Sequence, residues 1–192
     1  NQYSGIANMA GISLPSSGEE DKVAQGIAVI QSYDFFQELV QKNNLFFKLL
    51  APQDWDKDTN SLVINSEIYN INSKQWVSNA QFSVNGRPSM QSSHRLFLNN
   101  FSISRDKKTG FVSIAYNHFS PHIAKEFIDT IISEINEIAR LEDIAIAQDT
   151  MDFLKDEANK TQFNDVKIGI NILIQKQVEK ISIAKSTPQY LF

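Results

Sequence analysis

Apolar residues recur at helical spacing along a stretch that begins at Pro121. Steps of three or four residues separate the members of one apolar stripe, which are Ile123, Phe127, Ile131, Ile135 and Ile138. Neither Gly nor Pro interrupts the sequence between Pro121 and Gly169. Ser120 is a good N-cap and proline is tolerated at the first helical position, so the start is well defined. We predict a helix from residue 121 to about residue 160, roughly 58 Å long at 1.5 Å per residue.

The apolar period lapses in the polar segment 159–165 and then resumes. A polar break between two helical patterns is typical of the turn between antiparallel helices. We therefore place the tip of a helical hairpin there and predict a return helix from Asp165 to about Lys185. The inner side of the return helix is predicted to carry Val166, Ile170, Leu173, Val178 and Ile181.

Upstream of this hairpin the pattern changes to loops and short helices. Residues 1–18 are rich in Gly, Ser and Asn and predict a loop. The acidic residues that follow favour a helix N-terminus, so a first helix is predicted there. A second, short helix is predicted from Asp34 to Gln41 after Ser32. The apolar run 45–50 is compatible with either a helix or a strand.

The next segment alternates between polar loops and short ordered stretches. We predict a polar loop at Asp54–Asn60 and a strand or partly ordered segment around Leu62, Ile64 and Ile68. We predict that residues 65–88 form a long irregular segment, which Trp76 anchors. Ser89 is a suitable N-cap for a short helix through about Leu98.

The clearest strand signal lies in residues 101–116. Apolar and polar residues alternate in Phe101–Ser104 and in Phe111–Tyr116, on either side of a turn that ends in Gly110. This pattern predicts a β-hairpin. The closing segment Pro188–Phe192 predicts a further strand.

Together these elements predict the α+β class within a single domain. A small mixed α/β body with a β-sheet is expected from residues 1–120 and 186–192. A long protruding α-helical hairpin is expected from residues 121–185.

Composition narrows the possible partners. The chain has 192 residues, 42% of them hydrophobic, which suffices for one domain with a core. Its net charge of -4 gives no positive footprint for nucleic acid or anionic lipid, so neither is expected as a partner. The absence of cysteine excludes disulfides, thiolate metal sites and a catalytic thiol. No apolar run reaches the roughly 18–20 residues of a membrane span.

Three aspartates at alternate positions, Asp54, Asp56 and Asp58, resemble the start of a calcium-binding loop. That loop requires Gly where this chain has Thr59 and Glu where it has Asn65. We therefore expect a solvated turn here in place of a calcium site.

His118 and His122 have the spacing of a helical metal pair, but Ser120 and Pro121 lie between them. We expect a pair of surface histidines at the entry to the long helix. No phosphate-binding glycine loop, nucleophile elbow or zinc-protease motif occurs.

Two acidic pairs, Glu134 with Glu137 and Glu142 with Asp143, are expected on the charged outer face of the long helix. A glycosidase pair would need a cleft, which the pattern does not indicate. We assign no catalytic, cofactor-binding or metal-binding residues, expect no cofactor, and predict a protein that is not an enzyme.

The two long helices carry more apolar residues than one inner stripe each requires. Additional apolar positions around a projecting hairpin indicate contact with a neighbouring copy of the chain. We predict a homo-oligomer, and the residues expected at its contacts or at a partner contact are Ile132, Ile144, Phe163, Ile168, Ile172 and Ile174.

The order of several motifs resembles that of the Wzz-type chain-length determinants, the polysaccharide co-polymerase family. The resemblance covers nearly the whole chain. It rests on Ala10–Pro15, Lys22–Ala24, Asp106–Ile114, Ser120–Lys125, Ile135–Glu137, Phe153–Lys155, Lys160–Thr161 and Tyr190–Phe192.

The resemblance implies a periplasmic domain, with a membrane-proximal body, between two transmembrane helices of the bacterial inner membrane. The chain starts at Asn1 and ends in a strand-like segment, so we expect a piece of such a longer protein. Family members form rings and set the modal length of a surface polysaccharide, usually lipopolysaccharide O-antigen. The implied partners are a separate polysaccharide polymerase, the growing glycan, or both. Nothing in the sequence resembles the tyrosine-kinase parts of a related branch.

Other functions remain possible from the sequence. The regulated polymer could be a capsular polysaccharide or an exopolysaccharide. A periplasmic adaptor of an efflux or secretion system also combines a β-rich body with a helical hairpin, but lipoyl-like repeats should then flank the hairpin. A polysaccharide-modifying enzyme would need a cleft with paired acids of perturbed pKa, which the sequence does not offer.

Overall fold

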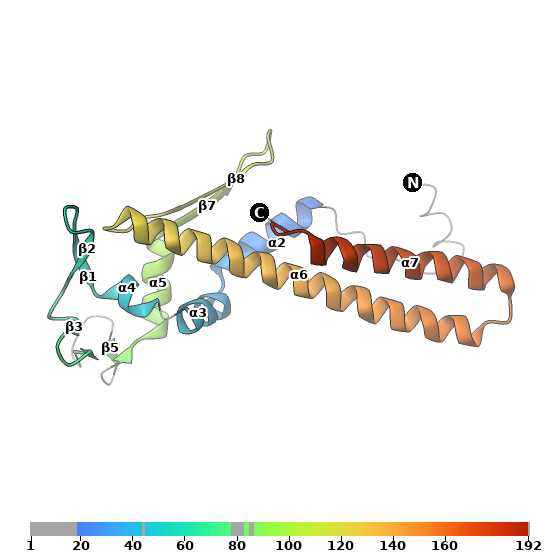
Figure 1. The fold of residues 1–192 in the computed structure, drawn as a ribbon, viewed down its shortest axis with the longest axis horizontal. Helices are drawn as coiled ribbons and strands as arrows, with labels where there is room; N and C mark the ends of the chain where they lie inside the picture. The colour runs from blue at the N-terminus through green and yellow to red at the C-terminus, as the bar shows by residue number, and fades with distance from the viewer. Residues whose placement is uncertain (1–18, 44, 78–82, 85–86, 192) are drawn as a thin grey trace. The chain divides into compact units, whose positions relative to one another are not determined.

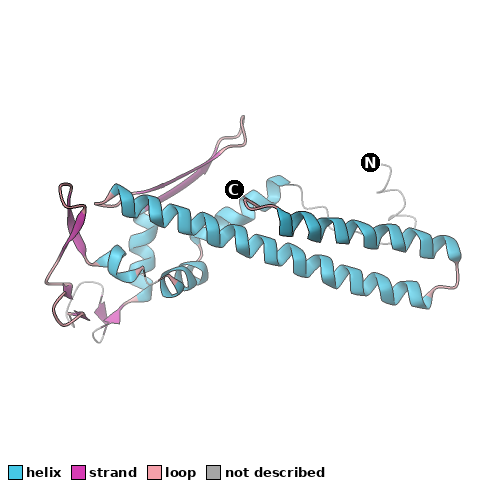
Figure 2. Cartoon of the chain, in the orientation of Figure 1, coloured by secondary structure: helices cyan, strands magenta, loops and turns pink. Residues whose placement is uncertain are grey.

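The computed structural model describes residues 19–43, 45–77, 83–84 and 87–191. The chain divides into two compact units, residues 27–134 and residues 1–26 together with 135–192. The predicted α+β class with a long helical hairpin is confirmed (Figure 1, Figure 2). The predicted division into a base and a protruding hairpin stays a prediction.

The longest element is α6, a helix of 40 residues from Pro121 to Lys160. It begins where the sequence predicts because the buried Ser120 side chain caps it, accepting a hydrogen bond from the backbone N–H of Ile123 at 3.4 Å. At 1.5 Å per residue the helix is about 60 Å long. Its first part, to Glu134, belongs to one compact unit and its remainder to the other.

The shorter helices follow the predicted pattern. They are α2 (Glu19–Gln31), α3 (Tyr33–Lys42), α4 (Phe46–Leu50) and α5 (Met90–Asn100). Serine side chains cap two of them: Ser32 accepts a hydrogen bond from the N–H of Phe35, and Ser89 accepts one from the N–H of Ser92. The apolar run 45–50, for which helix and strand were both open, is helical.

The described strands form four separate two-stranded antiparallel pairs. They are β1 (Pro52–Asp56) with β2 (Ser61–Ile64), β3 (Tyr69–Asn70) with β4 (Gln75–Trp76), β5 (Ser83–Val84) with β6 (Arg87–Pro88), and β7 (Phe101–Arg105) with β8 (Val112–Tyr116). The predicted polar loop at Asp54–Asn60 is wrong for its first three residues, because Trp55 on β1 pairs with Leu62. Ile68 lies in a turn and not in a strand. Trp76 anchors its segment against Tyr69, with ring centroids 5.1 Å apart.

The predicted β-hairpin at residues 101–116 is confirmed as β7 and β8. Its register runs from Phe101 opposite Tyr116 to Arg105 opposite Val112. The Asp106 carboxylate accepts hydrogen bonds from the backbone N–H groups of Thr109 and Lys108. These hydrogen bonds shape the turn and lower the pKa of Asp106. Gly110 completes the turn with φ +76°, a conformation that favours glycine.

An aromatic cluster forms the core of the unit 27–134. Phe97 on α5 is 1% exposed and stacks on Phe36 of α3, with ring centroids 5.2 Å apart. It also stacks on Phe101 of β7 at 4.9 Å and meets Phe127 of α6 at 5.8 Å. Tyr116 of β8 lies 6.2 Å from it, so this one ring meets rings from four other elements of the unit.

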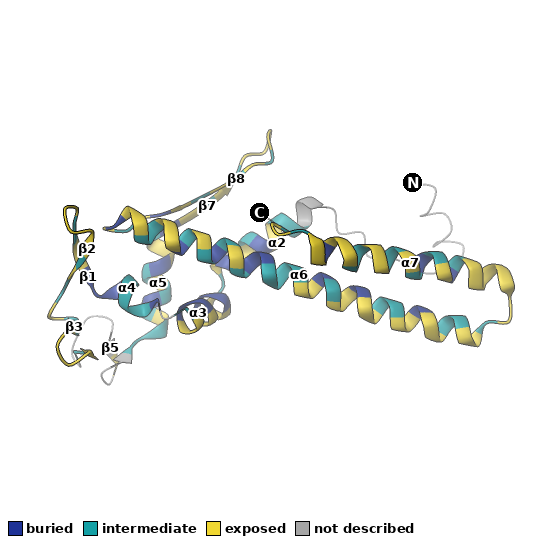
Figure 3. Cartoon of the chain, viewed as in Figure 1, coloured by how far each residue is buried: buried dark blue, intermediate teal, exposed yellow. Residues whose placement is uncertain are grey.

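The predicted helical hairpin and its tip are confirmed in the other unit. After residues 161–163, α7 runs from Asn164 to Ser186 and packs against α6 through the buried side chains of Leu154, Ile170 and Leu173. Val166 and Val178 were predicted on the inner side but are 40% and 47% exposed. Figure 3 shows exposed positions alternating with buried and intermediate ones along α7. Val166 lies in the first turn beside the tip, and Val178 lies about 140° around the helix from Leu173.

The segment Pro188–Leu191 does not form the predicted strand. Its residues 188–190 are bends, and the backbone N–H groups of Tyr190 and Leu191 donate hydrogen bonds to the Asn136 side chain on α6. Because a side-chain oxygen takes both donors, they are not available for a strand ladder. The last residue of the predicted strand, Phe192, lies outside the described residues.

Candidate functional site

A buried carboxylate, Asp143 on α6, gathers charged and polar groups from three other segments. The residue is 7% exposed. Its carboxylate accepts a hydrogen bond from the Lys22 ammonium of α2 and one of 2.6 Å from the Tyr190 hydroxyl. The Lys180 ammonium of α7 lies 3.3 Å from the other carboxylate oxygen. We call these four residues the Asp143 cluster.

The cluster keeps Asp143 ionised. Burial by itself would raise the pKa of Asp143, but the hydrogen bonds from Lys22 and Tyr190 and the positive charges of Lys180 and Lys22 outweigh it. The pKa of Asp143 therefore lies below the ordinary 3.8. Burial and the neighbouring Asp143 raise the pKa of Tyr190, so its phenol stays a hydrogen-bond donor.

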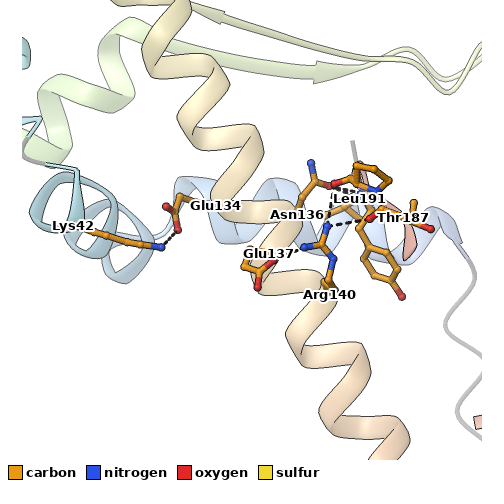
Figure 4. Close-up of polar contacts among 9 residues, drawn as sticks. Lys42, Glu134, Asn136, Glu137, Arg140, Thr187 and Leu191 are labelled. Atoms are coloured by element: carbon orange, nitrogen blue, oxygen red, sulfur yellow. Dashed lines mark hydrogen bonds and ion pairs between the residues drawn. The ribbon is translucent and has the colours of Figure 1, made fainter. Parts of the chain in front are cut away.

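Two further side chains of α6 hold the segment that follows α7. Asn136 accepts the hydrogen bonds from Tyr190 and Leu191, and Arg140 donates to the carbonyl oxygens of Thr187 and Pro188 at 3.0 Å each. Figure 4 shows Asn136 and Arg140 pointing toward this segment. Together with the Asp143 cluster they join α2, α7 and the C-terminal segment to α6.

The expected outer-face position is wrong for Asp143 and holds for its neighbour Glu142, which is exposed. Glu137 pairs with Arg140, and Glu134 pairs with Lys42 at 2.7 Å (Figure 4). A local signal could have identified Asp143, because it lies on the four-residue steps that connect the buried Ile135 and Ala147. A charge on a buried stripe indicates partners from elsewhere in the chain.

The six residues predicted at oligomer contacts differ in exposure. Phe163 in the tip loop and Ile168 on α7 are 75% and 60% exposed. The other four are half-buried, and Ile174 packs against the hairpin core. The half-buried residues are Ile132, Ile144, Ile172 and Ile174. Contact of the six with another copy stays a prediction.

The structure adds exposed apolar residues that the sequence pattern did not single out. Leu141 and Phe153 on α6 are each more than half exposed. Phe153 directly precedes the buried Leu154, about 100° around the helix, so its position relative to the buried stripe could have identified it.

Of the aspartates that resembled a calcium loop, Asp54 and Asp56 lie on β1, and Asp58 lies in the turn that follows. Asp56 accepts hydrogen bonds from the backbone N–H groups of Asp58 and Thr59, and those from Thr59 lower the pKa of Asp56 most. Among the described residues, no three His, Asp or Glu side chains come together as a metal site.

The two candidate histidines lie in different environments. His122 is exposed, with its ring 5.8 Å from Trp55. His118 is half-buried, so the expectation of two surface histidines is wrong for it. The N–H of Ser120 donates to His118 Nδ1 at 3.1 Å, and Nε2 lies 2.8 Å from the carbonyl oxygen of Lys48, which fixes Nε2 as the protonated nitrogen. His118 thus connects α4 to the cap of α6.

Replacing His118 by phenylalanine is expected to lower the free energy of unfolding by roughly 1–2 kcal/mol, because Lys48 and Ser120 lose their hydrogen-bond partner while the ring volume is kept. Chemical denaturation measures the change. The matched control is His122→Phe at an exposed ring, which is expected to change stability by less than about 0.5 kcal/mol. Equal effects of the two substitutions would show that the His118 hydrogen bonds contribute nothing.

No helix in the described part of the chain is both long enough and apolar enough to cross a membrane. The sequence matches no protein-family model, and the comparison with curated proteins finds no relative.

Proposed function

We propose that this chain is the periplasmic domain of a non-enzymatic regulator of surface polysaccharide length, of the polysaccharide co-polymerase family. The intact protein would sit in the bacterial inner membrane through flanking helices and act as a homo-oligomeric ring. The regulated polymer would be lipopolysaccharide O-antigen.

The observation that carries the proposal is the α6–α7 hairpin, which exposes large apolar side chains. Phe153 on α6, Phe163 at the tip and Ile168 and Ile183 on α7 are all more than half exposed. Exposed apolar residues mark contacts with other proteins where they gather into a patch, and four such residues on one hairpin favour contacts of this kind. The motifs behind the family resemblance support the proposal further, since Asp106–Ile114 forms the β7–β8 turn region and Ser120–Lys125 forms the start of α6.

In this mechanism several copies stand side by side and present their hairpins to the polymerase or to the growing glycan. A ring makes many weak contacts at once, so the ring as a whole binds its partner stably. Each contact after the first forms at high effective concentration. The assembly then biases the point at which extension stops. No bond is made or broken by the chain itself.

Capsular polysaccharide or exopolysaccharide is the alternative polymer for the same mechanism. The helical hairpin also favours a periplasmic adaptor of an efflux or secretion system. That reading requires lipoyl-like β repeats on both sides of the hairpin.

A gel ladder of surface polysaccharide tests the proposal. The host strain lacks its own length regulator, and the intact parent gene is supplied. We expect a random ladder to collapse into a modal band. Phe163→Ser combined with Ile168→Ser should broaden that band, whereas Gln162→Ser with Lys167→Ser, at exposed polar neighbours, should leave it unchanged. A random ladder in the presence of membrane-inserted protein would contradict the proposal.

A further inference from the structure

The turn between β7 and β8 presents an apolar side chain beside two positive charges. Phe111 is 74% exposed. Lys107 and Lys108 lie in the same turn, and neither forms an ion pair within the described part of the chain. Figure 1 shows this turn at the free end of the β7–β8 ribbon. An exposed aromatic ring flanked by lysines has the composition of an anchor for an apolar socket with an acidic rim.

An apolar groove lies at the opposite end of β8. It has a volume of about 480 Å³ and is open to solvent. Tyr116 at the end of β8 and Pro121, Ala124 and Ile128 on α6 supply its apolar lining. The volume falls in the range of ligand sites and exceeds what one side chain needs, so Phe111 could enter together with its adjoining backbone.

A second groove, of about 490 Å³, adjoins the first at Lys125 and carries carboxylates. Two of them, Glu126 and Asp129, are paired with Lys48 and Lys125 at 2.5 Å each. Their side chains are 48% and 58% exposed, and a carboxylate can accept further hydrogen bonds after a first pairing. The apolar groove is therefore bordered by ion pairs, with exposed carboxylates beside Lys48 and Lys125.

We propose that the β7–β8 turn of one copy docks on the next copy, with Phe111 in the apolar groove and Lys107 and Lys108 against the carboxylates of Glu126 and Asp129. The inference deepens the proposed function, because it rests on a homo-oligomer and names the contact. Anchor and groove occupy different places on each copy, so the contact is heterologous. Repeated heterologous contacts generate a ring when the rotation between copies closes.

A chain cannot fill its own groove with this anchor. The five residues of β8 separate Phe111 from Tyr116 by roughly 17 Å at 3.3–3.4 Å per strand residue. The stiff antiparallel pairing with β7 holds the two apart. The occupant must therefore come from another molecule.

Charge favours a second copy over a membrane as the partner of the turn. Two lysines attract an anionic lipid surface only weakly, at about 1 kcal/mol each. The exposed carboxylates of Glu126 and Asp129 on a second copy offer the same lysines specific partners.

Disulfide cross-linking tests the contact. The natural chain has no cysteine, so only the introduced cysteines can form a disulfide. One variant carries Thr109→Cys in the turn, and another carries Asn117→Cys at the groove. The full 192-residue chain is used at a concentration on the order of millimolar, which matches that of copies tethered side by side. We expect each variant alone to remain largely monomeric, their mixture to form dimers, and the double-cysteine chain to form a ladder of larger species.

Adding Phe111→Ser should slow the cross-linking by about tenfold or more, as expected for the loss of a buried aromatic anchor. The matched control is Ile71→Ser at another exposed apolar side chain, 60% exposed, which should leave the rate unchanged. Charge reversal of Lys107 and Lys108 to Glu should also slow cross-linking, and reversal of Glu126 and Asp129 to Lys should restore it.

The contact is overturned if the mixture forms no more dimers than the single variants, or if Phe111→Ser and Ile71→Ser act alike. Binding of the chain to phosphatidylglycerol vesicles that Phe111→Ser abolishes, without cross-linking, would assign the turn to the membrane and also overturn it. The polysaccharide ladder separates this result from the proposed function. Length control that persists in Phe111→Ser would refute the contact alone, whereas a random ladder with the natural protein would refute the function.

Discussion

Replacing Phe97 by alanine should lower the stability of the unit 27–134 by about 3–5 kcal/mol, the range for removing a buried aromatic side chain. Phe97 is 1% exposed and its ring contacts rings from α3, β7, β8 and α6. These elements come from distant parts of the sequence, so neighbouring side chains cannot collapse into the space without moving several elements. Small domains have unfolding free energies of about 5–15 kcal/mol, so this loss is a large fraction of the total.

Thermal unfolding followed by circular dichroism measures the effect, and we expect the midpoint to fall by about 15 °C or more. Leu98→Ala is the matched control, because Leu98 is the next residue of α5 and is 38% exposed. It should cost less than about 1 kcal/mol. If both variants unfold at the same temperature, Phe97 is not the centre of the core that its contacts indicate.

The long helices could be predicted from the sequence because their signals are local. The four-residue steps from Ile123 to Ile135 and the Ser120 cap fix α6, and the polar break at 159–165 fixes the tip. Each signal involves residues that are close in the chain, so no tertiary contact is needed to interpret it. The β7–β8 turn is equally local, since Asp106 and Gly110 shape it themselves.

The cluster around Asp143 could not be predicted in the same way. Lys22 is 121 residues from Asp143 in the sequence, and Tyr190 is 47 residues away. The four-residue steps through Asp143 mark it as the buried one of the pair with Glu142, but nothing near it in the sequence identifies its partners. The strand expected at Pro188–Phe192 fails for the same reason, because Asn136 takes the backbone donors of this segment from 54 and 55 residues away.

The groove beside α6 also depends on tertiary structure. Pro121, Ala124 and Ile128 share one side of the helix by spacing, which the sequence shows. The groove needs Tyr116 and His118 as its other wall, and their placement follows from the β8 register.

Replacing Asp143 by asparagine should destabilise the unit that contains the hairpin by about 2–3 kcal/mol. Breaking a fully buried ion pair costs about 3–5 kcal/mol, and the lower value applies here because Lys22 and Lys180 are partly exposed and can turn toward water. The amide keeps the size of the carboxylate but places N–H donors against two ammonium groups and a phenol. We expect the hydrogen bonds that hold the C-terminal segment to open more often as a result.

The pH dependence of stability gives an independent check with a defined sign. The folded-state pKa of Asp143 lies below 3.8, so its contribution is fully present above that value and is lost as the pH falls through the lower folded-state pKa. Natural protein should therefore lose stability on acidification below about pH 4 more steeply than Asp143→Asn does. Denaturation at a series of pH values measures the difference.

Hydrogen exchange at the backbone amides of Tyr190 and Leu191 locates the effect, because both amides are protected by Asn136 next to the cluster. Asp143→Asn should speed their exchange, while Asp149→Asn, at an exposed aspartate of the same helix, should not. If the two variants match in stability, pH profile and exchange, the Asp143 cluster does not hold the segment. A difference confined to Asp143→Asn would identify this carboxylate as the group that joins α2, α7 and the C-terminal segment to α6.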